Sequence, residues 1–469
     1  WIFERDVDRG FLGEALAGKL IFPYKALVND AYLRFQEVKL KQRLIVELLE
    51  NLVLDFPELS YEFYIKPEYF MCETMFNRAR LFPLMVYGLL NLEEENLQSI
   101  LCGYLEALKK LETEKVIDFS NGFVRVSKQF ADKTRSPKVR FVNLLKPAPR
   151  ALFTTLLGVF PTILNLVSQN REMLLRLQHV TNGNSAFVQS FASPQKYLFV
   201  PTANGLVPFT NRMNIEVFAR KVLSADKNVD VEIEELGGIL NYVYLIKAST
   251  RKGERKAVVK EFKDWSSFKW FPLTLWTVGT RTFAVLGRSR LERECAINQF
   301  LYSKGFAVPK VLGVSPAERL VFMEYVDGEN VSSAIKRIAN AENIAEGEHD
   351  LKTVGKIGET FAKVHAVNVA LGDTKPENII VGEKGEIFLL DFEQSSRNGD
   401  KTWDIAEFLY YAGHDVPPFV ETRKAELIAK AFVKGYLAAG GNVKDVKRAG
   451  SPKYTKVFSV FTFPRLMLA

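Results

Sequence analysis

The sequence predicts an α+β protein in which a mainly α-helical N-terminal region precedes a region that mixes strands and helices. Apolar residues recur at helical spacing through residues 11–95, most clearly in Val38–Leu54. Farther along, short apolar and β-branched runs such as Ala257–Phe262 and Ile387–Leu390 have the length and composition of strands. A helical pattern over Val354–Leu371 lies between such runs, so strands and helices share the C-terminal region.

Composition sets outer limits on the fold and on the partners. With 469 residues the chain is long enough for two or three domains, and its formal net charge of +8 favours an anionic partner. Cys72, Cys102 and Cys295 lie far apart and form no Cys-x-x-Cys pair, so neither a disulfide framework nor a zinc site is indicated. Such cysteine usage is typical of a reducing compartment, and we expect a cytoplasmic location.

The residues with a chemical signature are concentrated in Leu371-Gly-Asp-Thr-Lys-Pro-Glu-Asn378 and in Asp391, which ends the apolar run after this loop. Phosphoryl transfer requires a carboxylate that orients the attacking hydroxyl and oxygen ligands that hold Mg²⁺. The same residue types are ordinary in surface turns. Here, however, a helical pattern precedes the loop and a hairpin pattern follows it. The spacing therefore favours phosphoryl transfer, with Asp373 orienting the acceptor and Asn378 and Asp391 carrying Mg²⁺.

These segments resemble the protein-kinase-like superfamily. The motifs His-Arg-Asp-Leu-Lys-Pro-Glu-Asn and Asp-Phe-Gly of protein kinases are matched by residues 371–378 and by Asp391-Phe-Glu393. The resemblance implies a two-lobed fold that uses ATP and Mg²⁺, with Lys375 reaching the γ-phosphate. Leu371 replaces the usual histidine, and we expect it to pack in the core instead. Glu393 replaces the usual glycine; we expect it to face solvent, the alternative being an additional metal contact.

The resemblance also predicts nucleotide-binding residues upstream. Lys260, in Ala-Val-Val-Lys, matches the lysine that contacts the α- and β-phosphates. Glu294 opens a helix where the carboxylate partner of that lysine is expected, with Glu292 as the alternative. Glu324 and Tyr325 end a strand at the expected hinge, where they would frame the adenine.

A candidate nucleotide loop contains Gly237 and Gly238, three residues before Asn241. It lacks the Gly-x-Gly-x-x-Gly of protein kinases and resembles the loops of aminoglycoside and methylthioribose kinases, which often read Gly-x-x-Asn-x-Val-Tyr. Adjacent glycines allow a tight hairpin whose amides approach phosphate. The alternative is a plain hairpin turn.

The segment between Asp391 and Asp404 is too short for the long activation segment of eukaryotic-type protein kinases, and the chain contains no Ala-Pro-Glu. This pattern resembles the atypical kinases: aminoglycoside phosphotransferases, RIO kinases and the small kinase of the KEOPS complex. The run Arg290–Leu312 is most similar to the KEOPS kinase, and the resemblance covers residues 216–440. It implies that Asp404 opens a C-lobe helix and braces the catalytic loop, and that His365 packs inside the helix before it.

We expect four segments along the chain. They are an α-helical region at 1–95, a winged helix at 96–135 with Asn121-Gly122 at its hairpin turn, a basic linker with an apolar helical segment at 136–215, and a kinase-like domain at 216–469 with its N-lobe at 216–325 and its C-lobe at 330–469. Asp6 and Asp8 faintly resemble the end of a nucleotidyltransferase domain, but two acids do not predict that activity.

Three segments offer contacts with partners. Residues 128–150 hold seven basic residues and one acidic residue, which suits RNA or another anionic surface, or else a solvated linker. Residues 151–170 carry no charge but many polar groups, so a buried or interfacial helix is favoured over membrane contact. Residues 263–288 interleave aromatic and basic residues, as expected of a docking surface or of a packed helix.

Taken together, these features predict an atypical kinase that uses ATP and Mg²⁺ to phosphorylate Ser/Thr hydroxyls on protein. A small-molecule kinase of the aminoglycoside-phosphotransferase type would use the same residues on a small hydroxylated molecule. An RNA- or ribonucleoprotein-associated ATPase of the RIO or KEOPS type would use the winged helix and the basic run as well.

Overall fold

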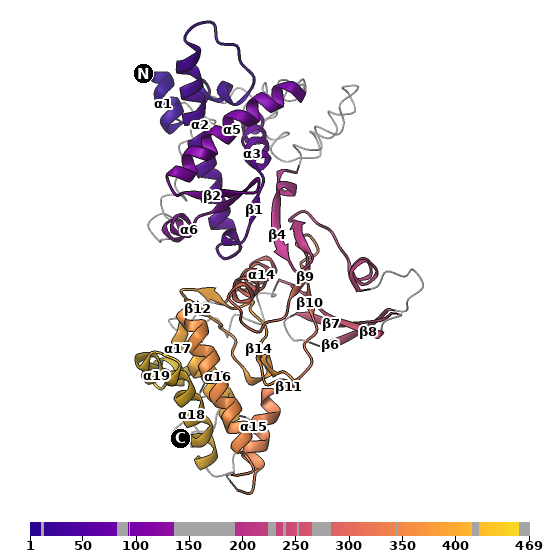
Figure 1. Cartoon of the computed structure of the whole chain (residues 1–469). Helices are drawn as coiled ribbons and strands as arrows, with labels where there is room; N and C mark the ends of the chain where they lie inside the picture. Colours follow the sequence, from indigo (N-terminus) through magenta and orange to yellow (C-terminus); the bar gives the residue numbers. More distant parts are fainter. Residues whose placement is uncertain are drawn as a thin grey trace. The chain divides into compact units, whose positions relative to one another are not determined.

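The structure is a computed structural model of the whole chain (Figure 1). It describes residues 1–10, 14–81, 92, 94–135, 193–223, 231–237, 241–250, 253–264, 283–343, 345–414 and 422–458. The chain forms two compact units, one of Trp1–Pro201 with Leu206–Asn211 and one of Thr202–Gly205 with Arg212–Ala469. The α+β class and the kinase-like fold are confirmed.

The first unit is built around α2 (Asp30–Asp55), the long helix predicted from the pattern in Val38–Leu54. The side chain of Asn29 caps it by accepting a hydrogen bond from the Tyr32 N–H at 3.2 Å. The other α-helices that the structure describes in this unit are α1 (Ile2–Arg9), α3 (Pro67–Leu81), α5 (Glu94–Thr113) and α6 (Lys128–Thr134). The stretch expected to be helical throughout also contains a two-residue strand, β1 (Tyr64–Ile65).

Asp6 and Asp8 both have local structural partners. The buried Asp6 carboxylate accepts hydrogen bonds from the backbone N–H groups of Glu14, Leu16 and Ala17 at 2.9 to 3.1 Å. Asp8 forms an ion pair of 2.7 Å with Lys39 on α2. These contacts account for both acids by packing of the N-terminal segment.

The predicted hairpin is present as β2 (Ile117–Ser120) and β3 (Phe123–Val126). Asn121 and Gly122 at its turn have φ of 53° and 76°, both in the left-handed region that a two-residue turn of this type requires. The strand β3 pairs with β1, which pairs with β4 (Leu198–Thr202), and the sheet runs β2-β3-β1-β4-β5, with β5 at Gly205–Pro208. The sheet therefore reaches beyond residues 96–135, and the winged helix stays a prediction.

The N-lobe of the second unit is an antiparallel sheet in the order β6-β7-β8-β10-β9. Its strands are β6 (Val231–Gly237), β7 (Tyr242–Thr250), β8 (Gly253–Glu261), β9 (Val311–Ser315) and β10 (Leu320–Glu324). Helix α14 (Gly287–Ser303) packs against β9 and β10. A short helix, α12 (Ile215–Phe218), places the ring of Phe218 on Phe322 with centroids 4.0 Å apart. The register sets Lys260 between Val243 and Val321 in the middle of the sheet.

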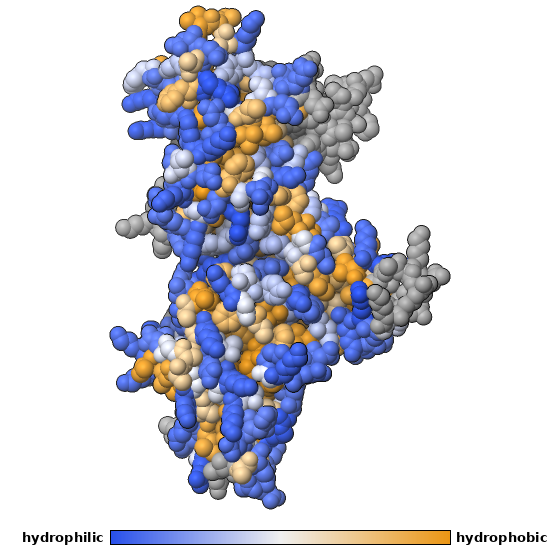
Figure 2. Space-filling model, viewed as in Figure 1, coloured by the Kyte–Doolittle hydropathy of each residue, from blue (hydrophilic) through white to orange (hydrophobic). Residues whose placement is uncertain are grey.

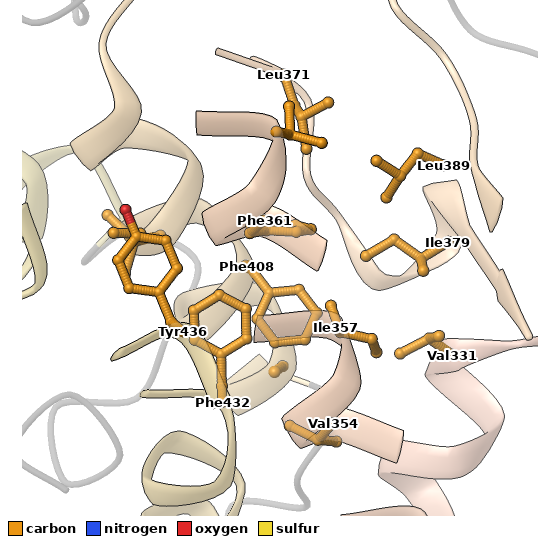
Figure 3. Packing of buried hydrophobic residues seen from close by; sticks show 14 of the residues in the cluster. Val331, Val354, Ile357, Phe361, Leu371, Ile379, Leu389, Phe408, Phe432 and Tyr436 are labelled. Carbon is orange, nitrogen blue, oxygen red and sulfur yellow. The ribbon is translucent and has the colours of Figure 1, made fainter. Parts of the chain in front are cut away.

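The C-lobe is mainly helical. Its elements are α15 (Val331–Asn340), α16 (Glu348–Ala366), α17 (Lys401–His414), α18 (Thr422–Ala438), α19 (Val443–Ala449) and α20 (Pro452–Phe458), with short strands β11 (Glu329–Asn330), β12 (Val369–Ala370), β13 (Ile379–Val381), β14 (Ile387–Leu389) and β15 (Ser396–Arg397). Helices α16 and α18 lie side by side (Figure 1). The core next to these helices contains a group of aromatic rings in contact with one another, those of Phe361, Phe408, Phe432 and Tyr436 (Figure 3). Leu371 is buried in the same core, as predicted for the residue that replaces the usual histidine.

Polar and charged side chains cover most of the face seen in Figure 2, with smaller apolar areas between them. Within the described ranges, no helix has both the length and the apolar character that crossing a bilayer requires. Of the basic run 128–150, the structure describes residues 128–135, where Arg135 forms an ion pair with Glu58 at 2.7 Å. The apolar segment 151–170 lies outside the described residues, as do residues 265–282 of the aromatic insertion.

Candidate active site

The loop from Leu371 to Asn378 connects β12 to the short helical turn η5 (Pro376–Asn378) and is held by α17. The Asp404 carboxylate accepts hydrogen bonds from the backbone N–H groups of Leu371 at 2.6 Å and Gly372 at 2.7 Å. Gly372 has φ 80°, a conformation that favours glycine. The predicted brace from Asp404 is thus present, and the same helix contributes Glu407, whose carboxylate accepts from the Thr374 N–H at 2.8 Å.

His365 completes the support of this loop from α16. Its Nε2 lies 3.0 Å from Asp404 Oδ2, and its Nδ1 lies 2.9 Å from the Tyr436 hydroxyl. All of these groups are buried. Because a buried carboxylate is stable only when its oxygens are paired, the position of Asp404 and hence of the loop backbone is well determined.

Asp373, Lys375 and Asn378 lie together at the loop. Lys375 Nζ is 3.2 Å from Asp373 Oδ1, and the Asn378 side-chain amide donates to the Asp373 carbonyl at 3.2 Å. Burial lowers the pKa of Lys375, but the nearby charges of Asp373 and Glu407 outweigh this and the pKa is raised on balance. Lys375 is therefore held as a cation next to the carboxylate predicted to orient the acceptor hydroxyl.

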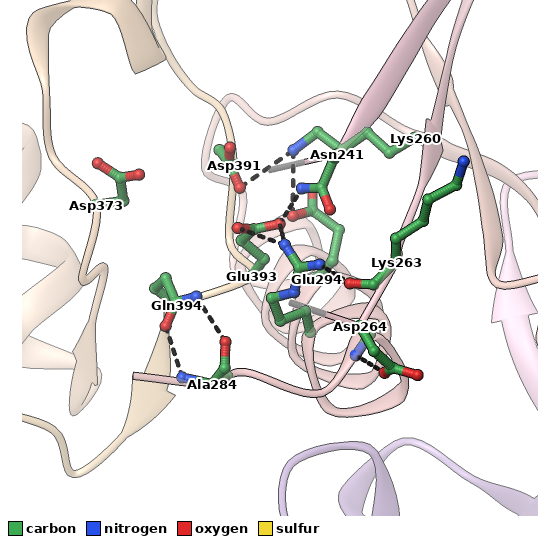
Figure 4. Close-up of polar contacts among 12 residues, drawn as sticks. Asn241, Lys260, Lys263, Asp264, Ala284, Glu294, Asp373, Asp391, Glu393 and Gln394 are labelled. Atoms are coloured by element: carbon green, nitrogen blue, oxygen red, sulfur yellow. Dashed lines mark hydrogen bonds and ion pairs between the residues drawn. The ribbon is translucent and has the colours of Figure 1, made fainter. Parts of the chain in front are cut away.

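Lys260 joins α14 to the segment that follows β14. Its Nζ lies 3.3 Å from Glu294 Oε2 and 3.2 Å from Asp391 Oδ1 (Figure 4). The Phe392 N–H donates to the same Glu294 oxygen at 2.8 Å, so Glu294, and not Glu292, is the partner of this lysine. Burial lowers the pKa of Lys260, but Asp391 and Glu294 raise it by more, which keeps the ammonium charged.

Asp391 has φ 63°, a left-handed conformation that aspartate tolerates better than most residues. Its Oδ1 is buried, and apart from Lys260 it has no hydrogen-bond partner among the described residues. The Leu390 N–H donates to the Asn378 carbonyl at 2.9 Å, which ties the segment of Asp391 to the catalytic loop.

The oxygens of Asn378 and Asp391 fit Mg²⁺, which prefers oxygen ligands and is usually held by one or two carboxylates together with substrate phosphates. Among the described residues there is no cluster of three or more His, Cys, Asp or Glu side chains arranged to hold a metal by themselves. Mg²⁺ held by Asn378 and Asp391 would take its remaining ligands from substrate phosphates and water.

The expectation that Glu393 faces solvent is wrong. Only 3% of Glu393 is exposed, and its carboxylate accepts hydrogen bonds from the side chains of Asn241 and Arg290 (Figure 4). Burial and the charge of Asp391 raise the pKa of Glu393 to about 7. A carboxylate in the place of glycine can be buried here because the guanidinium and the amide compensate for lost hydration.

Asn241 and Arg290 were not predicted as site residues. Asn241 belongs to the Gly-x-x-Asn pattern, and Arg290 lies four residues before Glu294, on the same face of α14. An arginine one helical turn before Glu294 indicates such a cluster only together with the acid at position 393.

Three other predicted nucleotide residues lie at or just after strand ends of the N-lobe sheet. Gly237 ends β6 at a register shift between β6 and β7, whereas Gly238 lies outside the described residues. Glu324 ends β10, and its side chain pairs with Lys310 at 3.4 Å. Tyr325 follows, with the ammonium of Lys256 5.3 Å from its ring centroid. The adenine-framing role of Glu324 and Tyr325 stays a prediction.

Comparison with known proteins gives a family match that spans this site and similarity to three further proteins. Residues 246–409 match the model of the lipopolysaccharide kinase (Kdo/WaaP) family. The chain is 27% identical over 107 residues to the KEOPS complex subunit Bud32 of Pyrococcus abyssi, covering 23% of this chain and 45% of that protein. It is 28% identical over 165 residues to the probable serine/threonine-protein kinase BUD32 homolog of Archaeoglobus fulgidus, covering 34% and 72%. A putative cyclin-dependent kinase F-2 of rice is 32% identical over 75 residues, covering 16% and 23%.

Proposed function

We propose that this chain, an atypical member of the protein-kinase-like superfamily and a phosphotransferase, uses ATP and Mg²⁺ to phosphorylate Ser/Thr hydroxyls on protein. The observation that carries the proposal is Lys260, whose ammonium lies within 3.3 Å of both Glu294 and Asp391. An ion pair of this kind positions the lysine that contacts the α- and β-phosphates beside the aspartate that binds the metal.

Each residue then has a defined task. Lys260 binds the α- and β-phosphates, and Glu294 keeps its ammonium in place. Asp373 orients the acceptor hydroxyl and accepts its proton, while Lys375 neutralises charge on the γ-phosphate. Mg²⁺ bound by Asn378 and Asp391 would supply electrostatic stabilisation of the transferring phosphoryl group. Asp404 and His365 keep the loop backbone fixed during transfer.

Two observations support a protein acceptor. Lys375, which the small-molecule relatives usually lack, is paired with Asp373 at 3.2 Å. The Archaeoglobus relative is named a probable serine/threonine-protein kinase, and it is the relative that the chain covers over the largest share of its length.

A sugar hydroxyl is the second candidate acceptor. The family model over residues 246–409 is that of lipopolysaccharide kinases, and the short segment between Asp391 and Asp404 leaves little chain for a peptide-docking platform. Both acceptors would use the same catalytic residues, so they differ only in the surface that presents the hydroxyl.

An RNA-associated ATPase is less favoured by the charges of the first unit. The exposed face of α5, which would be the nucleic-acid helix of a winged helix, carries Glu95, Glu106 and Glu112 against Lys109. Arg135, the third basic residue of the run, is paired with Glu58 at 2.7 Å. An acidic helix face repels phosphate.

The test incubates the chain with γ-labelled ATP and Mg²⁺, alone and with cell protein extract, with purified lipopolysaccharide, or with total RNA. We expect the label on protein, where hydrolysis of the labelled protein yields phosphoserine or phosphothreonine. We expect no label when Asp373→Asn replaces the unchanged chain. Label on the glycolipid alone would replace the protein acceptor with the sugar. ATP turnover stimulated by RNA, with no labelled product, would instead support the ATPase.

A further inference from the structure

Three polar side chains from three separate segments of the second unit meet beside the site. Asn241 belongs to the predicted nucleotide loop and immediately precedes β7, Arg290 lies on α14, and Glu393 lies two residues after Asp391. We call these three residues the Glu393 cluster. Their exposed fractions are 9%, 0% and 3%, so all three are buried.

The contacts of the cluster are specific. Arg290 Nη1 lies 3.3 Å from Glu393 Oε1 and 3.4 Å from Oε2, a two-oxygen contact between guanidinium and carboxylate. The Asn241 side-chain amide donates to Glu393 Oε2. Arg290 also donates through Nη2 to the Lys263 carbonyl, just after β8. The carboxylate of Glu393 thus holds the entry to β7 and, through Arg290, the exit of β8.

The next residue anchors the same segment a second time. The Gln394 side chain exchanges two hydrogen bonds with the backbone of Ala284, one accepted from its N–H at 2.9 Å and one donated to its carbonyl at 3.1 Å. Glu393 and Gln394 therefore connect the segment after Asp391 to the N-lobe at both ends of the insertion at residues 263–288. The two ends of this insertion are themselves joined, because the Gly287 N–H donates to the Asp264 carboxylate at 2.8 Å.

We propose that Glu393 is a positioning residue, which fixes the start of β7 and α14 relative to Asp391 so that the nucleotide site is assembled without an activation segment. The proposal rests on the proposed function and deepens it, because it assigns a role to a residue that the catalytic scheme leaves unused.

The free-energy cost of leaving a buried polar or charged group without a partner explains how the Glu393 cluster holds these segments together. Moving the start of β7 or α14 away from the segment of Asp391 would leave a buried amide, carboxylate or guanidinium without its partner. The Lys260–Glu294 pair lies one helical turn along α14 from Arg290, so a displacement of α14 would also separate Glu294 from Lys260. The arrangement that satisfies the Glu393 cluster is therefore the arrangement that aligns the nucleotide-binding residues.

The test compares Glu393→Gln, Glu393→Ala and Asn241→Ala with the unchanged chain. It measures the dissociation constant of a non-hydrolysable ATP analogue, the KM for ATP, kcat, and the Mg²⁺ concentration at half-maximal rate. We expect Glu393→Ala to raise the dissociation constant and the KM about tenfold, because one charge-assisted contact to each of two segments is lost. Glu393→Gln keeps a carbonyl oxygen for Asn241, so its dissociation constant and its KM for ATP should lie between those of the unchanged chain and those of Glu393→Ala.

The matched control is Asp350→Asn. Asp350 is also a buried carboxylate paired with an arginine, Arg337 at 2.7 Å, but it lies on α16 in the C-lobe. It should lower stability and leave the KM for ATP unchanged, which separates positioning from general loss of stability. In the double variant Glu393→Ala/Arg290→Met, the loss of affinity for the ATP analogue should be smaller than the combined losses of Glu393→Ala and Arg290→Met measured singly, because no unpaired charge remains.

Three results would overturn the proposal. Folded Glu393 and Asn241 variants that bind the ATP analogue as the unchanged chain does would show that the cluster has no positioning role. A raised Mg²⁺ requirement in Glu393→Gln at unchanged nucleotide affinity would make Glu393 a metal ligand instead. If the unchanged chain neither binds nor turns over ATP, the proposed function fails and this role fails with it. If Asp391→Asn abolishes turnover while the Glu393 and Asn241 variants leave it unchanged, the kinase assignment stands and only the positioning role fails.

Discussion

Asp404 Oδ2 accepts a hydrogen bond from the backbone N–H of Leu371 at 2.6 Å. Leu371 occupies the place of the usual catalytic-loop histidine, and its side chain is buried in the C-lobe core. The loop is therefore held through its backbone by a carboxylate and through an apolar side chain by packing. His365, from the preceding helix, supplies the imidazole that contacts the same carboxylate at 3.0 Å.

Asp404→Ala should impair both stability and turnover. It leaves the N–H groups of Leu371 and Gly372 and the ring of His365 without their buried acceptor, so we expect the free energy of unfolding to fall by roughly 3 kcal/mol or more. Chemical denaturation measures this change. Asp445→Ala, which removes a half-buried carboxylate on α19 that accepts from the Thr402 hydroxyl at 3.1 Å, should cost under about 1 kcal/mol; equal losses would contradict the bracing role.

Two glycines of α16 should respond in opposite ways to alanine. A Cβ at Gly358 would lie 2.1 Å from the Phe432 carbonyl of α18, so Gly358→Ala should force the helices apart and lower stability by roughly 1–3 kcal/mol. A Cβ at Gly355 would meet only the Ala431 carbonyl at 3.6 Å, so Gly355→Ala should gain up to about 1 kcal/mol from helix propensity. Thermal unfolding of both variants tests the contact. Similar melting temperatures would argue against the close packing of α16 and α18.

The cysteines should label in two classes. Cys72 and Cys295 are buried, and burial raises the pKa of Cys72 to about 12 and that of Cys295 well above its ordinary value, while Cys102 is exposed on α5. A chromogenic disulfide reagent at pH 8 should therefore react quickly with one thiol and with the other two only in denaturant. Cys102→Ser should remove the fast phase. Fast reaction of two thiols in folded protein would contradict the burial of α3 or α14.

Much of the kinase-like fold is legible in the sequence because its signals are local. The helix before the catalytic loop, the hairpin of β13 and β14, and the strands around Lys260 each have a period and flanking turn residues that predict the element. The strand β1 could not be predicted in this way, because two residues are too few to show an alternating apolar pattern. It is defined by its pairing with β3 and β4. The extent of the first sheet therefore depends on contacts between distant residues.

The site shows the same division. Asp373, Asn378 and Asp391 are marked by motif spacing, but the burial of Glu393 depends on Arg290 and Asn241, which lie more than a hundred residues before it in the sequence. A charged residue on its own is most simply read as exposed, since an unpaired charge is costly to bury. Only the folded arrangement shows that the guanidinium and the amide compensate for that cost.

The most direct test of the central claim is ATP turnover by Asp391→Asn, with Asp391→Ala beside it. Asparagine tolerates the left-handed backbone at this position and keeps the shape of the side chain, so the variant isolates the carboxylate charge from strain. The exposed Glu383, in the turn between β13 and β14, provides Glu383→Ala as the matched control. We expect a loss of at least roughly 100-fold in kcat for Asp391→Asn, with an unchanged unfolding transition and unchanged turnover by the control. Undiminished turnover by folded Asp391→Asn would contradict the assignment of this chain as a kinase that acts through Asp391.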